Sequence, residues 1–129
     1  TRSFHVTGVQ TCALPIFARV DLILHSPYAR AAVTAEYFAK LFPKAKKSSA
    51  NGLTPHDSPY GALALLRDLA DENVMFVGHE PHLSSLASLI LTGQELPLLE
   101  LKKAGIVGLE CLPRLQHCRL SFLLSPKWL

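Results

Sequence analysis

The chain has 129 residues, of which 49% are hydrophobic and 18% are charged, and its formal net charge at pH 7 is +3. These totals suit one globular domain with a moderate core and argue against intrinsic disorder. The basic residues are scattered apart from Lys44, Lys46 and Lys47, so we expect no nucleic-acid partner. No apolar run approaches the ~18 residues that a membrane span needs, so we expect no membrane partner. The totals leave the oligomeric state open.

The three cysteines indicate a reducing compartment. Cys12, Cys111 and Cys118 are odd in number, unclustered and without the spacing of metal ligands. Small secreted chains usually carry an even set of paired cysteines, whereas cytosolic thiols stay reduced. The sequence therefore predicts a cytoplasmic protein without a bound metal.

Residues 20–24 are mostly apolar and predict a short strand. Ser26 and Pro27 follow, a pair that suits the cap and first turn of a helix. We expect this helix over residues 28–42, because apolar residues recur there at helical spacing. The residues of this stripe are Val33, Tyr37 and Leu41.

Residues 44–59 are polar and interrupted by Asn-Gly and by prolines, which predicts a loop. Ser58 and Pro59 repeat the cap-plus-proline signal, and a second helix is expected over residues 60–70. Its inward positions are Leu63, Leu66 and Ala70.

Residues 74–77 are four consecutive apolar residues and predict a buried strand. Gly78 ends this strand, and leucines at helical spacing predict a helix over residues 81–91. Gly93 suits the helix end, because glycine readily adopts the left-handed conformation found there. His79 therefore lies at the carboxyl end of a buried strand, where open α/β sheets bind their ligands.

The last part of the chain has a strand-like pattern. Residues 104–112 and 118–124 are two β-like runs around a short turn, which predicts an antiparallel hairpin. With the preceding strands and helices, this predicts an α/β fold of three layers. Its sheet is mostly parallel, with helices on both faces and the antiparallel hairpin at the edge.

Two polar side chains are expected at one edge of this sheet. Arg30 lies in the first turn of the helix after one strand, and His79 follows another strand. A guanidinium offers a planar, permanently charged fork that suits phosphate. An imidazole can donate to a phosphoryl oxygen or move a proton. Each residue alone could be an ordinary surface or loop residue, but together they indicate a phosphate pocket.

The neighbours of these two residues have both ordinary and functional interpretations. Ser26 is a helix cap or a pocket residue, and Glu80 is a pocket acid or a carboxylate that favours the helix start. His82 is expected to face solvent, and His25 is expected in a loop. His79 and His82 are one residue too close for the zinc helix motif, which needs histidines at i and i+4, so no metal is expected.

Two segments carry a resemblance to a known family. Residues 24–35, Leu-His-Ser-Pro-Tyr-Ala-Arg-Ala-Ala-Val-Thr-Ala, resemble the Ser-Pro…Arg-Ala…Thr-Ala segment of the histidine phosphatase superfamily, the phosphoglycerate-mutase-like group. Residues 77–83, Val-Gly-His-Glu-Pro-His-Leu, resemble its second histidine motif. The Gly-His-Glu-Pro form, the small size and the Leu-Leu-Ser-Pro-Lys ending are most similar to the phosphohistidine phosphatase (SixA) branch. The resemblance covers residues 20–129.

The resemblance implies a mechanism and residue roles. In that family a histidine of an Arg-His-Gly motif on the first strand takes the phosphoryl group, and water then removes it, without metal or organic cofactor. Arg30 matches the second phosphate-binding arginine, and His79 matches the second histidine of the catalytic phosphate pocket. No Arg-His-Gly occurs in this sequence, because Arg2, His5 and Gly8 are not adjacent.

The first residues are interpreted as foreign to the domain. Residues 6–16, Val-Thr-Gly-Val-Gln-Thr-Cys-Ala-Leu-Pro-Ile, resemble the translation of a widely used short-read sequencing adapter. We therefore expect residues 1–16 to be a non-native segment. Residues 17–129 would then be a partial histidine phosphatase domain that lacks its first strand, its nucleophile and the following helix.

The expected function is that of a phosphohistidine phosphatase that acts on a phosphorylated signalling protein and is inactive as this chain. Two alternatives stay open. One is a phosphomonoesterase of the same superfamily that acts on a small phosphoester, and the other is a non-catalytic fragment that binds anions. Nothing in the remaining residues separates a protein substrate from a small one.

Overall fold

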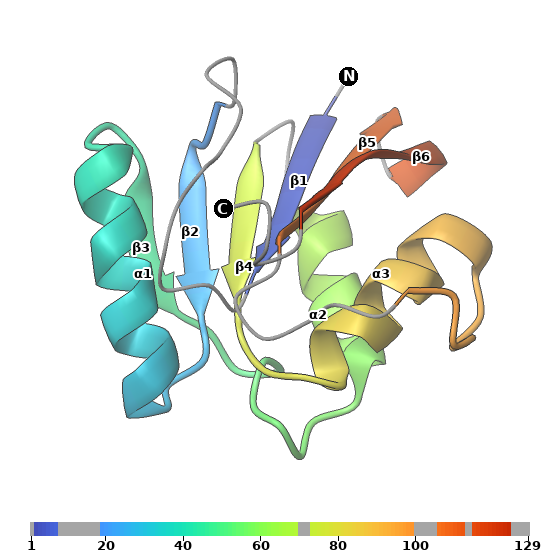
Figure 1. The fold of residues 1–129 in the computed structure, drawn as a ribbon, viewed down its shortest axis with the longest axis horizontal. Coiled ribbons are helices and arrows are strands. Elements are labelled where there is room, and N and C mark those ends of the chain that lie inside the picture. Colours follow the sequence, from blue (N-terminus) through green and yellow to red (C-terminus); the bar gives the residue numbers. More distant parts are fainter. Residues whose placement is uncertain (1, 8–18, 70–72, 100–105, 113–114, 125–129) are drawn as a thin grey trace.

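Helices and strands alternate through the middle of the chain in the computed structural model (Figure 1), which describes residues 2–7, 19–69, 73–99, 106–112 and 115–124. In chain order the elements are β1 (Arg2–Thr7), β2 (Leu22–His25), α1 (Ala29–Leu41), β3 (Lys46–Ser49), α2 (Pro59–Asp68), β4 (Val74–Val77), α3 (His82–Thr92), β5 (Ile106–Leu112) and β6 (Gln116–Leu124).

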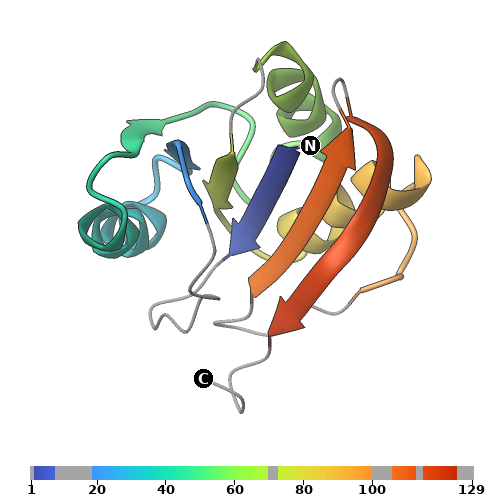
Figure 2. The same cartoon turned by 90° about the horizontal axis from the view of Figure 1, so that it is seen from above.

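The strands form one sheet in the order β3-β2-β4-β1-β5-β6. Strands β3, β2, β4 and β1 are parallel to one another. Strand β5 runs antiparallel to both β1 and β6, so that the last two strands form a hairpin beyond β1 (Figure 2). The predicted mostly parallel sheet with an antiparallel edge hairpin is confirmed.

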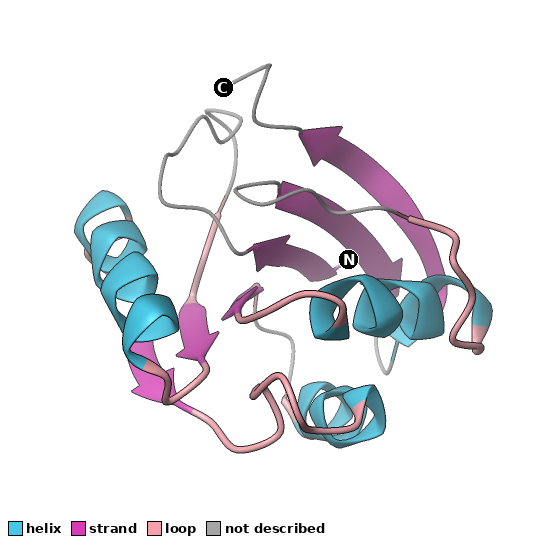
Figure 3. Cartoon of the chain, turned by 60° about the horizontal axis from the view of Figure 1, so that its bottom comes forward, coloured by secondary structure: helices cyan, strands magenta, loops and turns pink. Residues whose placement is uncertain are grey.

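Helices cover both faces of the sheet, as predicted. Figure 3 shows α1 on one side of the molecule and the α2–α3 pair on the other. Strand β4 separates the two cores because successive side chains of a strand point to opposite faces. Met75 and Val77 pack against Phe38 of α1, whereas Val74 and Phe76 belong to the core under α2 and α3.

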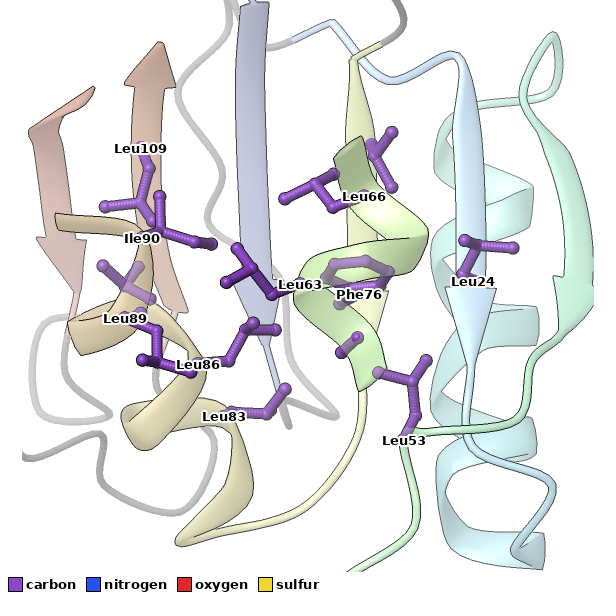
Figure 4. Packing of buried hydrophobic residues seen from close by; sticks show 14 of the residues in the cluster. Leu24, Leu53, Leu63, Leu66, Phe76, Leu83, Leu86, Leu89, Ile90 and Leu109 are labelled. Carbon is purple, nitrogen blue, oxygen red and sulfur yellow. The ribbon is translucent and has the colours of Figure 1, made fainter. Parts of the chain in front are cut away.

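The larger core lies between the sheet and the α2–α3 pair (Figure 4). Leu63 and Leu66 of α2 point into this core, as the sequence predicted, and Ala70 lies outside the described residues. The leucine stripe of α3 is buried in the same place. Its members are Leu83, Leu86 and Leu89.

The predicted ends of α2 and α3 are confirmed. The Ser58 hydroxyl accepts a hydrogen bond of 3.2 Å from the Tyr60 N–H at the start of α2, and Gly93 ends α3 with φ +80°. The expectation that Ser26 caps α1 is wrong, because the capping position is Tyr28. The Ser26 N–H donates to the Val77 carbonyl at 2.9 Å, so Ser26 still belongs to the sheet ladder.

Two parts of the sequence behave differently from their patterns. Strand β3 lies within the segment that was expected to be a loop. Its residues are all exposed, and it pairs only with β2 at the sheet edge, where exposed lysines are common. The predicted stripe lies on the outer side of α1, because another face of the helix packs against the sheet. The exposed stripe is Val33, Tyr37 and Leu41, and the buried face is Ala31, Thr34, Ala35 and Phe38.

The expectation of an empty place at the first strand is wrong, because β1 occupies it, whereas the loss of the native first strand stays a prediction. Strand β1 lies between β4 and β5, with Phe4 in register with Val74 and Leu109, and Thr7 in register with Val77 and Ile106. Without it, β4 and β5 would each expose a row of unpaired backbone groups in the middle of the sheet. An origin of residues 6–16 outside the native gene stays a prediction, and residues 8–16 lie outside the described residues.

The expectation that the cysteines are unclustered is wrong for two of the three. Cys111 and Cys118 form a disulfide across the β5–β6 hairpin, because the strand pairing brings together residues that are separated along the chain. The cytoplasmic location stays a prediction. The argument for it from unpaired cysteines no longer holds, because disulfides are rare in reducing compartments. None of the helices that the structure describes is long and apolar enough to cross a membrane.

Candidate functional site

The candidate site lies where the neighbouring parallel strands β2 and β4 end. The arrowheads of both strands point to the same lower edge in Figure 1. The hydrogen bond from the Ser26 N–H to the Val77 carbonyl extends their ladder by one residue. The turn after β2 and the turn after β4 are therefore adjacent. The sequence predicted this for the turn that leads to Arg30 and the turn that contains His79.

A hydrogen bond joins the two turns. The Nε2 atom of His79 lies 2.9 Å from the Oγ atom of Ser26, whose residue is fully buried. The same Oγ accepts the N–H of Tyr28 at 3.2 Å. The Tyr28 ring meets the His79 ring edge-on, with 5.2 Å between ring centroids. The imidazole is thus held by a hydroxyl and by an aromatic ring.

The surroundings of His79 keep its imidazole neutral. Partial burial lowers the pKa of His79, and electrostatic repulsion from His82, when that ring is protonated, and from the Arg30 guanidinium lowers it further. The ordinary pKa of histidine is about 6.5, so the ring is uncharged at neutral pH. A neutral imidazole has one N–H donor and one nitrogen that can accept a hydrogen bond.

Arg30 supplies a positive charge near His79. It is exposed in the first turn of α1, and its charge acts on His79. Among the described residues, no carboxylate lies within salt-bridge distance of its guanidinium. The backbone carbonyl of Arg30 accepts from the Thr34 hydroxyl at 3.1 Å within the helix. The guanidinium is therefore available to an anion.

Glu80 serves the start of α3. Its Oε1 accepts the Ser84 N–H at 3.0 Å, and its Oε2 accepts the Ser84 hydroxyl. Loss of water around the carboxylate raises the pKa of Glu80, and the two hydrogen bonds from Ser84 oppose this rise. This geometry corresponds to the helix-start interpretation of Glu80, which competed with that of a pocket acid.

The expectation that His82 faces solvent is wrong, because its side chain is 4% exposed. Neither ring nitrogen has a hydrogen-bond partner among the described residues. Burial lowers the pKa of His82. Polar backbone groups of Ser58 and Gly52 act in the opposite direction and raise it. A sequence signal existed, since His82 precedes Leu86 and Ile90 by four and eight residues and so continues the buried stripe of the helix.

His25 was also expected in a loop, but it is the last residue of β2 and is buried. Its Nδ1 lies 2.8 Å from the Ser26 carbonyl and donates to it. The ring therefore steadies the peptide that carries Ser26. Its place directly after an apolar strand was the available signal.

The carboxyl end of β1 meets the same edge of the sheet. Thr7 is the last residue of β1 and pairs with Val77 in parallel register, whereas Arg2 and His5 lie earlier in the strand. Arg2 and His5 therefore do not lie at the strand end, where the family's Arg-His-Gly motif would be expected. Within the described part of the chain, no three His, Cys, Asp or Glu side chains lie close enough to hold a metal ion.

Comparisons with known proteins place the fold. No protein-family model matches the chain. An uncharacterized protein of Picosynechococcus is 40% identical over 114 residues, which covers 83% of this chain and 69% of the relative. The chain is also similar to a solved structure of the protein histidine phosphatase SixA complexed with tungstate, with a TM-score of 0.78, 15% identity and 97% of both chains covered.

Two further solved structures agree. A putative phosphohistidine phosphatase SixA from Agrobacterium tumefaciens gives a TM-score of 0.69 over 97% of both chains at 19% identity. A phosphoglycerate mutase from Plasmodium falciparum gives 0.68 at 16% identity and covers 95% of this chain and 91% of that one. The chain therefore belongs to one family with the Picosynechococcus protein, and its fold is that of the histidine phosphatase superfamily, in the form shared by SixA proteins and phosphoglycerate mutases.

Proposed function

We propose that this chain carries the phosphate-binding half of a SixA-like phosphohistidine phosphatase and binds phosphoryl oxyanions at Arg30 and His79. The observation that carries the proposal is the junction of the β2 and β4 turns, where Ser26 holds the His79 ring within the field of the Arg30 charge. The SixA structure with tungstate supports it, because tungstate is a tetrahedral oxyanion like phosphate.

The proposed chemistry needs neither a metal nor an organic cofactor. Phosphoryl transfer spreads negative charge over the oxygens of the transferred group, so catalysis consists mainly of positioning and charge stabilisation. A guanidinium and an imidazole N–H supply both. The covalent step needs a nucleophilic histidine as well, and this sequence contains no Arg-His-Gly motif.

The proposed substrate of the parent enzyme is a signalling protein that carries phosphohistidine. The solved SixA proteins are named for this activity. A small phosphoester is the second candidate, because the solved phosphoserine phosphatase from Entamoeba histolytica, in complex with 3-phosphoglyceric acid, has the same fold. A cytoplasmic location and a truncated, inactive chain complete the proposal.

The first experiment measures oxyanion binding by isothermal titration calorimetry with tungstate and with inorganic phosphate. We expect weak binding that falls at least about tenfold in Arg30→Ala and in His79→Ala, because each loses a charge-assisted or buried hydrogen bond. Arg67→Ala is the matched control, since Arg67 is an exposed arginine in the last turn of α2. Binding that is equal in all four proteins would refute the site.

The second experiment restores the missing nucleophile. Thr7 ends β1 beside Val77, and Gly8 follows it, so the pair Val6→Arg and Thr7→His creates Arg-His-Gly at this strand end. We expect the variant to become phosphorylated by phosphoramidate, as detected by intact mass, and to lose this reaction when Arg30→Ala is added. The unchanged chain and the pair Val6→Arg with Thr7→Gln should stay unmodified.

Substrate choice follows from the same variant. Its turnover is compared on a phosphohistidine-bearing protein and on p-nitrophenyl phosphate. Preference for the protein supports the phosphohistidine proposal, and preference for the ester supports the second candidate. Turnover by the unchanged chain that disappears in His79→Ala would overturn the proposal of an inactive chain, because another residue would then act as nucleophile.

A further inference from the structure

We propose that Ser26 is a positioning residue that sets the tautomer of His79. Its hydroxyl donates to Nε2, so the imidazole proton is on Nδ1, and Nδ1–H is the donor presented to a phosphoryl oxygen. The last part of this inference rests on the proposed function. The assignment of the proton rests on the hydrogen bonds of Ser26 alone.

The hydrogen bonds of Ser26 leave one arrangement in which each polar group around its hydroxyl has a partner. The Tyr28 N–H can only donate, so Ser26 Oγ accepts at that contact. Among the described residues, the one other partner within hydrogen-bond distance of this Oγ is His79 Nε2, at 2.9 Å. If Nε2 carried the proton, Oγ would accept twice and its own O–H would have no acceptor.

Burial makes that alternative costly. Ser26 is 0% exposed, so an unsatisfied hydroxyl proton could not turn to bulk water. An unsatisfied buried donor loses its hydrogen bond to water without a replacement, so this arrangement is disfavoured. With the O–H directed to Nε2, the Tyr28 N–H, the Ser26 hydroxyl and the His79 Nε2 are all paired.

The arrangement determines what His79 can do. In the turn after β4, His79 has a neutral ring. Its Nε2 lone pair accepts the Ser26 hydroxyl, and its Nδ1–H is free to donate. Such a ring stabilises a bound oxyanion by donating a hydrogen bond, and it accepts a proton at Nε2 only if the Ser26 hydroxyl proton first turns away from that nitrogen. The Tyr28 ring lies edge-on to this imidazole, with 5.2 Å between ring centroids.

The test is the imidazole tautomer, read by long-range 1H–15N correlation NMR on ligand-free, 15N-labelled protein near pH 8, where histidine is neutral. We expect the His79 spectrum to show a protonated Nδ1 and an unprotonated Nε2. Ser26→Ala should shift the ring toward the Nε2–H form, and Ser26→Thr, which keeps a hydroxyl, should restore Nδ1–H. Ser48→Ala, at an exposed serine of β3, is the control and should change nothing.

A second readout is the His79 titration followed in the same spectra. A hydrogen bond donated to Nε2 favours the neutral ring, so its removal in Ser26→Ala should raise the pKa of His79. A merely structural serine would move neither the tautomer nor this titration. An Nε2–H tautomer in the unchanged protein overturns the inference, whether or not Ser26→Ala folds.

Failure of this inference is distinguishable from failure of the proposed function. The tautomer is measured without any anion, so an Nδ1–H ring in a protein that does not bind tungstate would sustain the Ser26 assignment and refute the function. Tungstate binding that depends on Arg30 and His79, together with an Nε2–H ring, would do the reverse.

Discussion

His82 places a titratable ring where the fold admits almost no water. The ring is 4% exposed, and burial lowers its pKa, while the backbone near Ser58 and Gly52 and the carboxylates of Asp57 and Glu95 oppose the shift. In the unfolded chain the pKa returns to about 6.5, so the unfolded state binds a proton more readily than the folded state. Stability due to this residue is fully present above pH 6.5 and is lost as the pH falls below it.

We therefore predict that the free energy of unfolding decreases between about pH 7.5 and pH 5.5 and that His82→Leu weakens this dependence. The contribution of one such group is at most about 1.4 kcal/mol per pH unit. Urea unfolding at several pH values measures it. His79 also has a lowered pKa and contributes in the same direction, so some dependence remains in the variant. Exposed His56 is the control, and a His82→Leu slope equal to that of His56→Gln would contradict the prediction.

The helix ends show how individual elements follow local rules. Gly93 has φ +80° and ends α3, and an added Cβ there would meet nothing within 4 Å. Any cost of Gly93→Ala is therefore a backbone cost, because an L side chain is disfavoured in the left-handed region. Gly61 lies inside α2 at an exposed position, and an added Cβ would approach only the Gly52 Cα, at 4.0 Å.

We predict opposite effects of the same substitution at these two glycines. Gly93→Ala should destabilise the protein by about 1 kcal/mol, and Gly61→Ala should stabilise it by roughly 0.5–1 kcal/mol through helix propensity. Chemical denaturation with a common slope measures both. Changes of the same sign would show that packing, rather than backbone conformation, decides these positions.

At the scale of the whole molecule, β1 links the parallel strands to the hairpin. It pairs with β4 on one side and with β5 on the other, so every N–H of its central residues faces a neighbouring strand. Proline there removes a ladder hydrogen bond and leaves a carbonyl of the sheet without its donor. An edge strand such as β3, which pairs only with β2, loses less.

We predict that Phe4→Pro costs on the order of 2–3 kcal/mol of unfolding free energy or prevents soluble expression, and that Lys47→Pro in β3 costs less. Thermal unfolding of both variants beside the unchanged protein measures the difference. Equal stability of Phe4→Pro and the unchanged chain would mean that the sheet does not need β1. This outcome bears only on the sheet and leaves the Arg30 and His79 site to its own tests.

The prediction from sequence succeeded where the cause is local. Four apolar residues before Gly78 predicted β4, the Ser58-Pro59 pair predicted the start of α2, and Gly93 predicted the end of α3, because strand period, capping and left-handed glycine are properties of a few consecutive residues. The shared sheet edge below Arg30 and His79 followed from the same rules, since parallel strands present their carboxyl ends together.

Only the tertiary structure decided the features that depend on distant partners. The Ser26–His79 hydrogen bond spans 53 positions, the pKa of His82 responds to the backbone of Gly52, which is 30 positions away, and the Cys111–Cys118 pair depends on hairpin register. Strand β1 has its place because β4 and β5 each need a partner on that side. Sequence by itself determined which local elements could form and which polar groups would end them. Packing determined which of these groups meet, because the energy of a buried contact depends on both partners, and no short stretch of chain contains both.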